Sequence, residues 1–249
     1  MKMPSRPISA VLVFAACSLS VLAQQIPQKV RFSVIKVKPD MVSEFRDSQA
    51  QATAAYKKAG IPWRAVWAPA AFGDQTKWIT VVPLGKMSDW DSPAIAAAMG
   101  EAAYQQWLAK AARCVTSVEY LVGISRPEIS IDSGGGASGL GQFSTVTVVL
   151  GKEGVFESKM KTEGLPALKK AGVKEFWVAR YLYGGESTST YIIAAPISSL
   201  GDLEEGSVLQ RAMGPESFQR YRESLTGIVT SVKYEILRYL PELSYAPSK

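Results

Sequence analysis

Two arginines stand near aromatic residues and could contact a ligand. Arg64 follows Trp63, and Arg180 comes shortly after Trp177. A guanidinium can pair with an anion and stack on an aromatic ring, so each group could hold an anionic aromatic ligand. Tryptophan and tyrosine are also common core residues, because each buries a large apolar area. The candidate ligand-binding residues are Arg64, Trp67, Trp78, Tyr120, Trp177, Arg180, Tyr191 and Tyr234.

Two of these candidates, Tyr120 and Tyr234, end two similar pentapeptides, residues 116–120 and 230–234. Core packing is the simpler explanation of their identity. The functional explanation is a phenol that donates a hydrogen bond or acts as a general acid. Within the same pentapeptides Glu119 is replaced by Lys233. These two charges lie either at a solvated rim, as charged residues usually do, or inward as a buried pair.

The chain contains no histidine and no asparagine, and these absences exclude several kinds of site. Without histidine there is no Ser-His-Asp or Cys-His catalysis and no His-ligated zinc, copper or haem iron. The acidic residues of the loops lack the spacing of a calcium-binding loop. They include Asp89, Asp91 and Asp202 after the third strands and the pair Glu204-Glu205. We therefore expect no metal site and no bound cofactor.

The candidate residues lie on a structural unit that the chain is expected to contain twice. The tetrapeptide Lys57-Lys58-Ala59-Gly60 returns at residues 169–172, and residues 98–100 return at 212–214. The spacing between equivalent positions drifts only from 112 to 114, as short loop insertions would cause. We expect a signal peptide over residues 1–23, a first repeat over 24–130, a Gly/Ser-rich linker over 131–142, a second repeat over 143–241 and a tail over 242–249.

Each copy has the pattern β-α-β-β-α-β, which is the order of a ferredoxin-like unit and predicts an α+β fold. Alternating β-branched stretches predict strands, and lysines followed by glycine predict helix ends. The expected strands are 30–37, 61–69, 77–84, 115–124, 144–150, 174–183, 190–196 and 229–239. The expected helices are 39–60, 92–113 with a division at Gly100, 155–171 and 206–225. Asp40 is expected to cap the first helix. Pro166 is expected to kink or break the third helix. Such a kink is either a tolerated irregularity or a device that opens a cleft beside the helix.

The chain resembles the dimeric α+β-barrel superfamily in its element order, its duplication and its aromatic-rich helices, such as Tyr104-Gln105-Gln106-Trp107 and Phe218-Gln219-Arg220-Tyr221. The resemblance implies two ferredoxin-like sheets packed sheet to sheet as an intrachain pseudo-dimer, with a pocket between sheet and helices in each half. Members include cofactor-free monooxygenases, haem-degrading enzymes, isomerases and binding domains, so the resemblance implies no single chemistry. The best-known monooxygenase members use an Asn, a Trp and a His. This chain has only the Trp, so that mechanism does not carry over.

The N-terminal residues have the three-part pattern of a secretory signal. Lys2 and Arg6 precede an apolar stretch, and residues 21–23 offer a small-residue cleavage site. We therefore expect an exported protein, periplasmic or extracellular, with lipidation at Cys17 as the alternative. No later segment is apolar enough to span a membrane. Cys114 then remains as the single cysteine and is expected to be a buried thiol.

The net charge of +6 is spread along the chain without clusters, which argues against a nucleic-acid partner. A small molecule is the expected partner, and self-association beyond the intrachain pseudo-dimer is left open. The leading hypothesis is an exported protein that binds a small apolar or aromatic molecule. One alternative is a cofactor-independent monooxygenase or isomerase acting on a small aromatic substrate. The other is a structural or interaction module without a ligand.

Overall fold

The first half of the chain folds in the order strand, helix, two strands, helix and strand. The computed structural model describes residues 28–132 and 139–246. The elements of the first half are β1 (Lys29–Val37), η1 (Pro39–Met41), α1 (Val42–Lys58), β2 (Ala65–Pro69), β3 (Lys77–Pro83), η2 (Met87–Trp90), α2 (Ala94–Met99), α3 (Glu101–Cys114), β4 (Val115–Ser125), η3 (Pro127–Ile129) and β5 (Ile131–Asp132). Gly60 follows α1 and Gly100 divides α2 from α3 as predicted, with φ values of +74° and +83° that suit glycine. The predicted cap at Asp40 is wrong. Asp40 lies in the 3-10 turn that begins at Pro39, and no side chain caps α1.

The second half repeats this order with more interruptions. Its elements are β6 (Leu140–Val148), α4 (Glu153–Lys159), the π-helical turn η4 (Met160–Gly164), α5 (Leu165–Lys170), β7 (Glu175–Tyr183), β8 (Thr190–Ile197), η5 (Leu200–Leu203), α6 (Val208–Met213), α7 (Pro215–Ser224), β9 (Val229–Tyr239) and η6 (Pro241–Leu243). The expected continuous helix 206–225 is instead two helices, because Gly214 interrupts it with a φ of +77°. The predicted signal peptide and residues 133–138 of the predicted linker lie outside the described residues.

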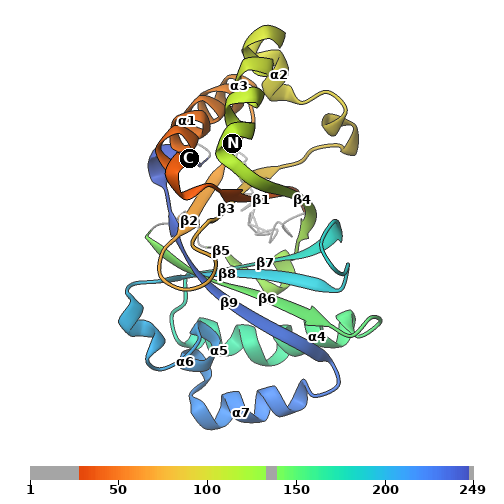
Figure 1. Ribbon diagram of the computed structural model, residues 1–249. Helices are drawn as coiled ribbons and strands as arrows, with labels where there is room; N and C mark the ends of the chain where they lie inside the picture. Colours follow the sequence, from red (N-terminus) through yellow and green to blue (C-terminus); the bar gives the residue numbers. More distant parts are fainter. Residues whose placement is uncertain (1–27, 133–138, 247–249) are drawn as a thin grey trace, which may run out of the picture.

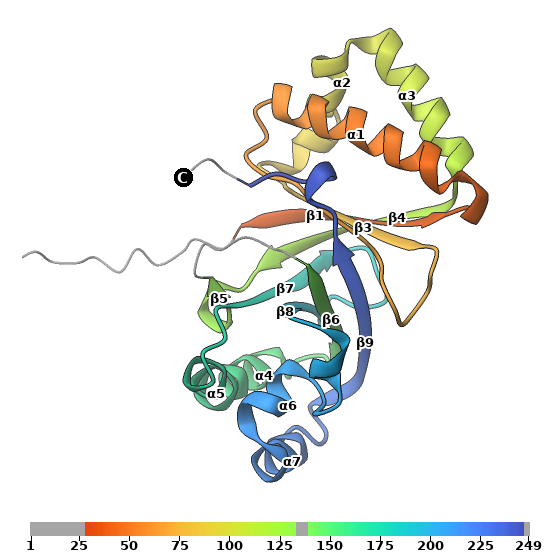
Figure 2. The same ribbon diagram turned by 90° about the vertical axis from the view of Figure 1, so that its left-hand side faces the viewer.

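Eight strands from both halves close into one antiparallel barrel. Their order is β4-β1-β3-β2-β9-β6-β8-β7, and β7 pairs back with β4. The sequence predicts two sheets that face each other. In the structure their edge strands also pair, β2 with β9 and β4 with β7, which leaves no open edge in the barrel. Helices α1–α3 and α4–α7 cover opposite outer sides of this barrel (Figures 1 and 2).

Aromatic side chains fill the interior of the barrel, because alternation along a strand sends every second side chain inward. Trp67 lies there and packs edge-on against Phe143 and Tyr239, with ring centroids 4.9 Å and 5.1 Å away. The intervening side chains face the helices and form separate apolar clusters on the two outer sides. The barrel interior thus holds one apolar cluster, and each outer side has its own. No helix in the described part of the chain is long and apolar enough to cross a membrane.

Candidate functional site

The two closing strands, β4 and β9, leave the same positions open on their outer faces. Tyr120 is 53% exposed and Tyr234 is 48% exposed, and Val118 and Val232 are 40% and 45% exposed. Strand residues fully covered by helices would be buried, so a gap separates each closing strand from the helices packed over its sheet. Core packing, the simpler explanation of the identical tyrosines, is therefore wrong. Glu119 and Lys233 are also exposed, as expected for a solvated rim.

In the second half this gap is a cavity of about 640 Å³ between the sheet and the helices. Its apolar lining includes Phe156, Met160, Phe176, Val208, Leu209, Phe218, Tyr221 and Leu225. Ser144 and Tyr234 face it from β6 and β9. The Gln142 Oε1 atom accepts a hydrogen bond from the Val208 amide at 2.9 Å, which ties α6 to the sheet at the cavity wall.

The π-helical turn η4 supplies part of the cavity wall. Phe45 and Phe156 occupy equivalent places, because each packs on the ring at the start of the third strand of its half, Trp78 or Tyr191. These phenylalanines are 111 positions apart, whereas Lys57 and Lys169 further along the same helices are 112 apart. The second helix thus has one extra residue, which is the defining feature of a π turn.

This turn brings Met160 into the cavity wall. The Tyr221 hydroxyl donates to the Met160 Sδ atom at 2.9 Å. Gly164 leaves room for that thioether, since a Cβ atom there would lie 3.1 Å from it. Pro166 comes just inside α5, directly after the π turn, and the helix continues through it, so the irregularity is a π turn and not a break; the cavity lies beside it.

Tyr221 is a packing residue whose hydroxyl already donates to the Met160 Sδ atom. It is 4% exposed, and burial raises the pKa of its phenol well above the ordinary value. At neutral pH it therefore stays protonated, with its proton directed at sulfur. The remaining phenol at the cavity is Tyr234, whose ring stands at the open side.

The equivalent region of the first half carries a cation and more aromatic rings. Arg31 takes the position on β1 that Gln142 holds on β6, next to the inward-facing Phe32 and Phe143. The Arg31 guanidinium lies 5.8 Å from the centre of the Tyr56 ring and 5.4 Å from that of Trp90, and it donates to the Tyr56 hydroxyl. Sequence reasoning did not select Arg31, although its place between the inward-facing Val30 and Phe32 indicates a side chain on the outer face.

Arg64 lines neither described pocket. It is 2% exposed beneath α1 and donates to Gln49 Oε1 at 2.5 Å and to the Leu243 carbonyl at 3.0 Å. Burial lowers the pKa of its guanidinium to about 10. The residue fastens the C-terminal segment to α1, so its observed contacts are those of a structural group.

Arg180 and Tyr191 meet on the outer face of the second half, at the α4 end. Tyr191 is fully buried, and its hydroxyl donates to Glu157 Oε1 at 2.7 Å. Burial raises the pKa of this phenol, and the bond to the Glu157 carboxylate raises it further. Glu157 also pairs with Arg126, which follows β4. This network links the first half of the chain to α4.

Of the predicted tryptophans, Trp67 and Trp78 are core residues, and Trp177 is partly buried at the edge of the barrel core. Trp67 lies inside the barrel, and Trp78 is 3% exposed against Phe45 beneath α1. Trp177 packs on Phe32 at 5.8 Å, on the inner side. Strand alternation explains why the predicted groups separate, since Trp177 points inward while Arg180 points outward.

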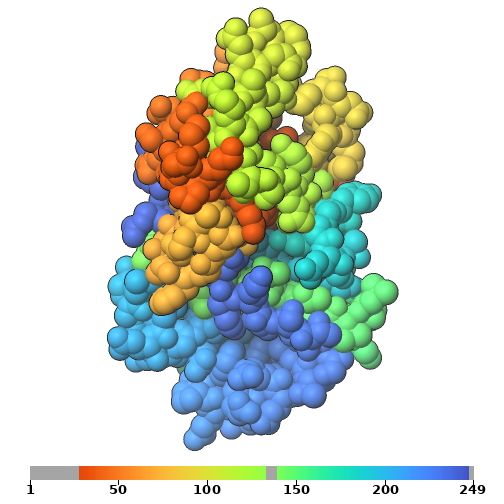
Figure 3. All heavy atoms as spheres, in the orientation of Figure 1, coloured from red at the N-terminus to blue at the C-terminus, as the bar shows by residue number. Residues whose placement is uncertain are grey.

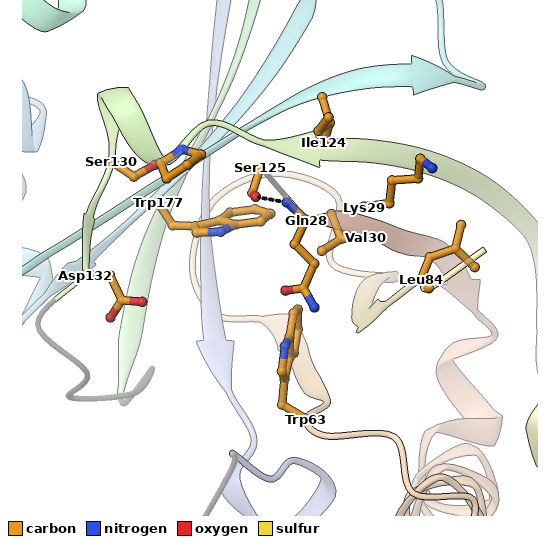
Figure 4. Close-up of a pocket in the computed structure, with 12 residues that line it drawn as sticks. Gln28, Lys29, Val30, Trp63, Leu84, Ile124, Ser125, Ser130, Asp132 and Trp177 are labelled. Carbon is orange, nitrogen blue, oxygen red and sulfur yellow. Dashed lines mark hydrogen bonds between the residues drawn. The ribbon is translucent and has the colours of Figure 1, made fainter. Parts of the chain in front are cut away.

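A further pocket, of about 800 Å³, opens at one end of the barrel. Trp63 and Trp177 line it, and the Gln28 amide donates to Ser125 Oγ at 2.7 Å in its wall (Figure 4). Gln28 and Asp132, which also line it, are the described residues next to the gaps at 1–27 and 133–138. We assign it no role. Elsewhere in the described ranges, no group of three or more Cys, Asp or Glu side chains could hold a metal ion.

Comparison with solved structures finds proteins of similar fold. No protein-family model matches the chain, and no curated protein matches it. A monooxygenase-like protein from Lactobacillus acidophilus superposes with a TM-score of 0.60 at 10% identity, over 89% of this chain and 97% of that one. An anthrone oxidase-like protein superposes with a TM-score of 0.58 at 13% identity, over 87% and 93%. Chlorite dismutase from Candidatus Nitrospira defluvii gives 0.53 at 14% identity, over 86% and 91%.

These neighbours belong to the dimeric α+β-barrel superfamily. The chain therefore has the fold that its sequence resembles, with the closed barrel of both halves at its centre. At 10–14% identity the likeness concerns the fold alone.

Proposed function

We propose that this protein binds a small, uncharged aromatic molecule in the second-half cavity. The observation that carries the proposal is a cavity of about 640 Å³ that is lined mainly by apolar and aromatic side chains and is open beside Tyr234. Pockets of roughly 300–1,000 Å³ with such walls are typical of small-molecule sites. Removal of an aromatic ring from water into such a cavity is favourable because apolar surface is buried on both sides.

The charges at this cavity favour a neutral ligand. The deeper polar side chains, Gln142 and Ser144, are uncharged, and Gln142 is already bonded to the Val208 amide. Arg222 stands at the rim and is exposed to solvent. A charged ligand group in the deeper part would lose hydration without gaining a partner.

Calorimetric titration with 2-naphthol tests this proposal. Tyr234→Ala should weaken binding roughly 3- to 10-fold, as expected for loss of one aromatic contact. Tyr120→Ala is the matched control, because it removes the equivalent, similarly exposed ring from the other half. Equal affinities for the native chain and Tyr234→Ala would refute the assignment, and absence of binding would favour a structural or interaction module.

A cofactor-independent monooxygenase is the second candidate, and the monooxygenase-like and anthrone oxidase-like neighbours favour it. Anthrone is a suitable trial substrate. Its methylene group would be oxidised to a carbonyl by O2, giving anthraquinone and water. Tyr234 would act there as the hydrogen-bond donor to the substrate oxygen. Oxygen uptake above the uncatalysed rate that falls in Tyr234→Phe, with binding retained, would establish the enzyme, and uptake at the uncatalysed rate would reject it.

We also infer that the two halves are tandem ferredoxin-like repeats and that the chain is exported after cleavage behind Ala23. The common strand order, β4-β1-β3-β2 and β9-β6-β8-β7, supports the first inference. The charged, apolar and small-residue succession of residues 1–23 supports the second. The intact mass of the protein from its own host tests the second, because a chain beginning at Gln24 and one lipidated at Cys17 differ in mass.

A further inference from the structure

Arg31 is a partly exposed cation that has no carboxylate partner within residues 28–132 and 139–246. One of its terminal nitrogens donates to the Tyr56 hydroxyl, and its Nε–H group is buried without an acceptor. Among the described residues it forms no ion pair. The Arg64 guanidinium lies 5.5 Å from the centre of the same Tyr56 ring, and its hydrogen-bond partners are also neutral. Two guanidiniums therefore lie near one phenol, and in the described part of the chain neither forms an ion pair with a carboxylate.

The surroundings of Arg31 are aromatic and open to solvent. Trp90 lies under its guanidinium and meets Tyr120 edge-on at 5.4 Å. Tyr104 and Trp107 of α3 stack at 5.8 Å, and the Trp107 Nε1–H donates to the Ser48 carbonyl at 2.8 Å, which fixes that ring on α1. Figure 3 shows a hollow between α3 and the segment that carries η2. The exposure of Tyr120 and Val118 agrees with such an opening.

The pKa of Tyr104 supports the proximity of these groups. Burial raises it, and the neighbouring Tyr56 and Tyr120 phenols raise it further, while Arg31 lowers it. The phenols of Tyr56 and Tyr120, the Arg31 guanidinium and the Glu101 carboxylate thus all lie within electrostatic range of Tyr104. At neutral pH the phenol of Tyr104 is protonated and can donate a hydrogen bond.

We propose that the first-half hollow is a second binding site, specific for planar aromatic carboxylates. The carboxylate would pair with Arg31, and the ring would pack on Trp90 and Tyr120. A charge-assisted bond to a guanidinium is about twice as strong as a neutral one, and a cation held by aromatic rings is already oriented for it. The second half has Gln142 in place of Arg31, so the two halves differ in the charge that they accept.

The test compares two probes with the same ring system, 2-naphthoate and 2-naphthol, on the chain beginning at Gln24. Calorimetry gives both dissociation constants, and the indole N–H signals of Trp90 and Trp107 in an NMR spectrum report binding at this hollow. In the native protein 2-naphthoate should move both signals and bind more tightly as the salt concentration falls. Arg31→Met should weaken 2-naphthoate about tenfold or more and remove the salt dependence.

Arg113→Met is the matched control, because it removes one exposed arginine from the same half away from the hollow. It should leave the affinity for 2-naphthoate within about twofold of the native value, since rim charges are screened. Tyr120→Ala provides a second variant if Arg31→Met does not fold. Its half-exposed ring can be removed without opening the core, and it should weaken 2-naphthoate while leaving 2-naphthol in the second half unaffected.

The proposal would be overturned if Arg31→Met and Arg113→Met changed the affinity for 2-naphthoate by the same factor. It would also be overturned if 2-naphthoate bound without moving the indole N–H signals of Trp90 and Trp107. This site is independent of the proposed second-half site. Loss of 2-naphthol binding in Tyr234→Ala bears only on the second half, and loss of 2-naphthoate binding in Arg31→Met bears only on the first.

Discussion

Closure of the barrel at the β4–β7 seam predicts an unusual sensitivity at Gly184. This residue follows β7 with a φ of +76°, and a Cβ atom there would lie 2.6 Å from the Tyr120 carbonyl oxygen and 2.8 Å from the Leu121 side chain. The first of these contacts is with backbone, which cannot rotate away. Gly184→Ala should therefore force β4 and the β7–β8 connection apart.

Gly172 offers a matched control for the size of this effect. It has a φ of +74°, and its added Cβ atom would meet nothing within 4 Å. The left-handed backbone alone costs an alanine about 1 kcal/mol at either position. The clash at Gly184 should add roughly 1–3 kcal/mol, as overpacking does elsewhere. For a domain of this size each kcal/mol lowers the melting temperature by about 2–4 °C.

Thermal and urea unfolding of the two variants measures the difference. Gly172→Ala should lose about 1 kcal/mol of stability and Gly184→Ala about 2–4 kcal/mol. If the two variants lose the same amount, the β7–β8 connection does not approach β4 as closely as described. The reasoning about the seam would then be refuted.

Three other predictions concern buried groups outside the candidate sites. Arg64→Met should lower the free energy of unfolding in urea by roughly 2 kcal/mol, because Gln49 Oε1 loses its donor and the Leu243 carbonyl keeps only the Thr53 hydroxyl. This loss outweighs the gain from no longer burying a charge, and a more stable variant would contradict it. Lys77→Met should lower the free energy of unfolding in urea by roughly 3–5 kcal/mol, because the Glu235 carboxylate is then buried beside a methionine. The additional substitution Glu235→Leu should restore most of this stability. Cys114 is fully buried and burial raises the pKa of its thiol, so a chain beginning at Gln24 should react with a disulfide reagent only as fast as it unfolds. Rapid labelling of the native chain would show that the thiol is accessible.

The order of strands and helices followed from local sequence, because turns, glycine stops and alternating apolar residues act within a few positions. Gly100 is predictable as a helix division on this basis, and it separates α2 from α3. Gly214 divides the expected helix 206–225 in the same way, with a φ of +77°. Pairing of β2 with β9 and of β4 with β7 could not be predicted in this way, since it depends on how two twisted sheets meet in space.

The candidate residues were harder to predict because neighbours in a strand face opposite ways. Trp63 and Arg64 are adjacent in the chain, yet Trp63 packs on the barrel interior while Arg64 lies beneath α1. Arg31 stands in an apolar strand with no aromatic neighbour on its own face, and its partners Tyr56, Trp90 and Tyr104 come from separate elements. Only the folded chain brings them together.

The central claim is that the second-half cavity holds a small uncharged aromatic molecule. The most direct test is an NMR measurement on protein with labelled methionine methyl groups, saturated with 2-naphthol. Met160 lines the cavity, whereas Met41 and Met99 lie in the first half and serve as internal controls. The account predicts cross-relaxation between the protons of 2-naphthol and the Met160 methyl group, with none at Met41 or Met99. Bound 2-naphthol that contacts the first-half methyl groups and leaves Met160 unaffected would contradict it.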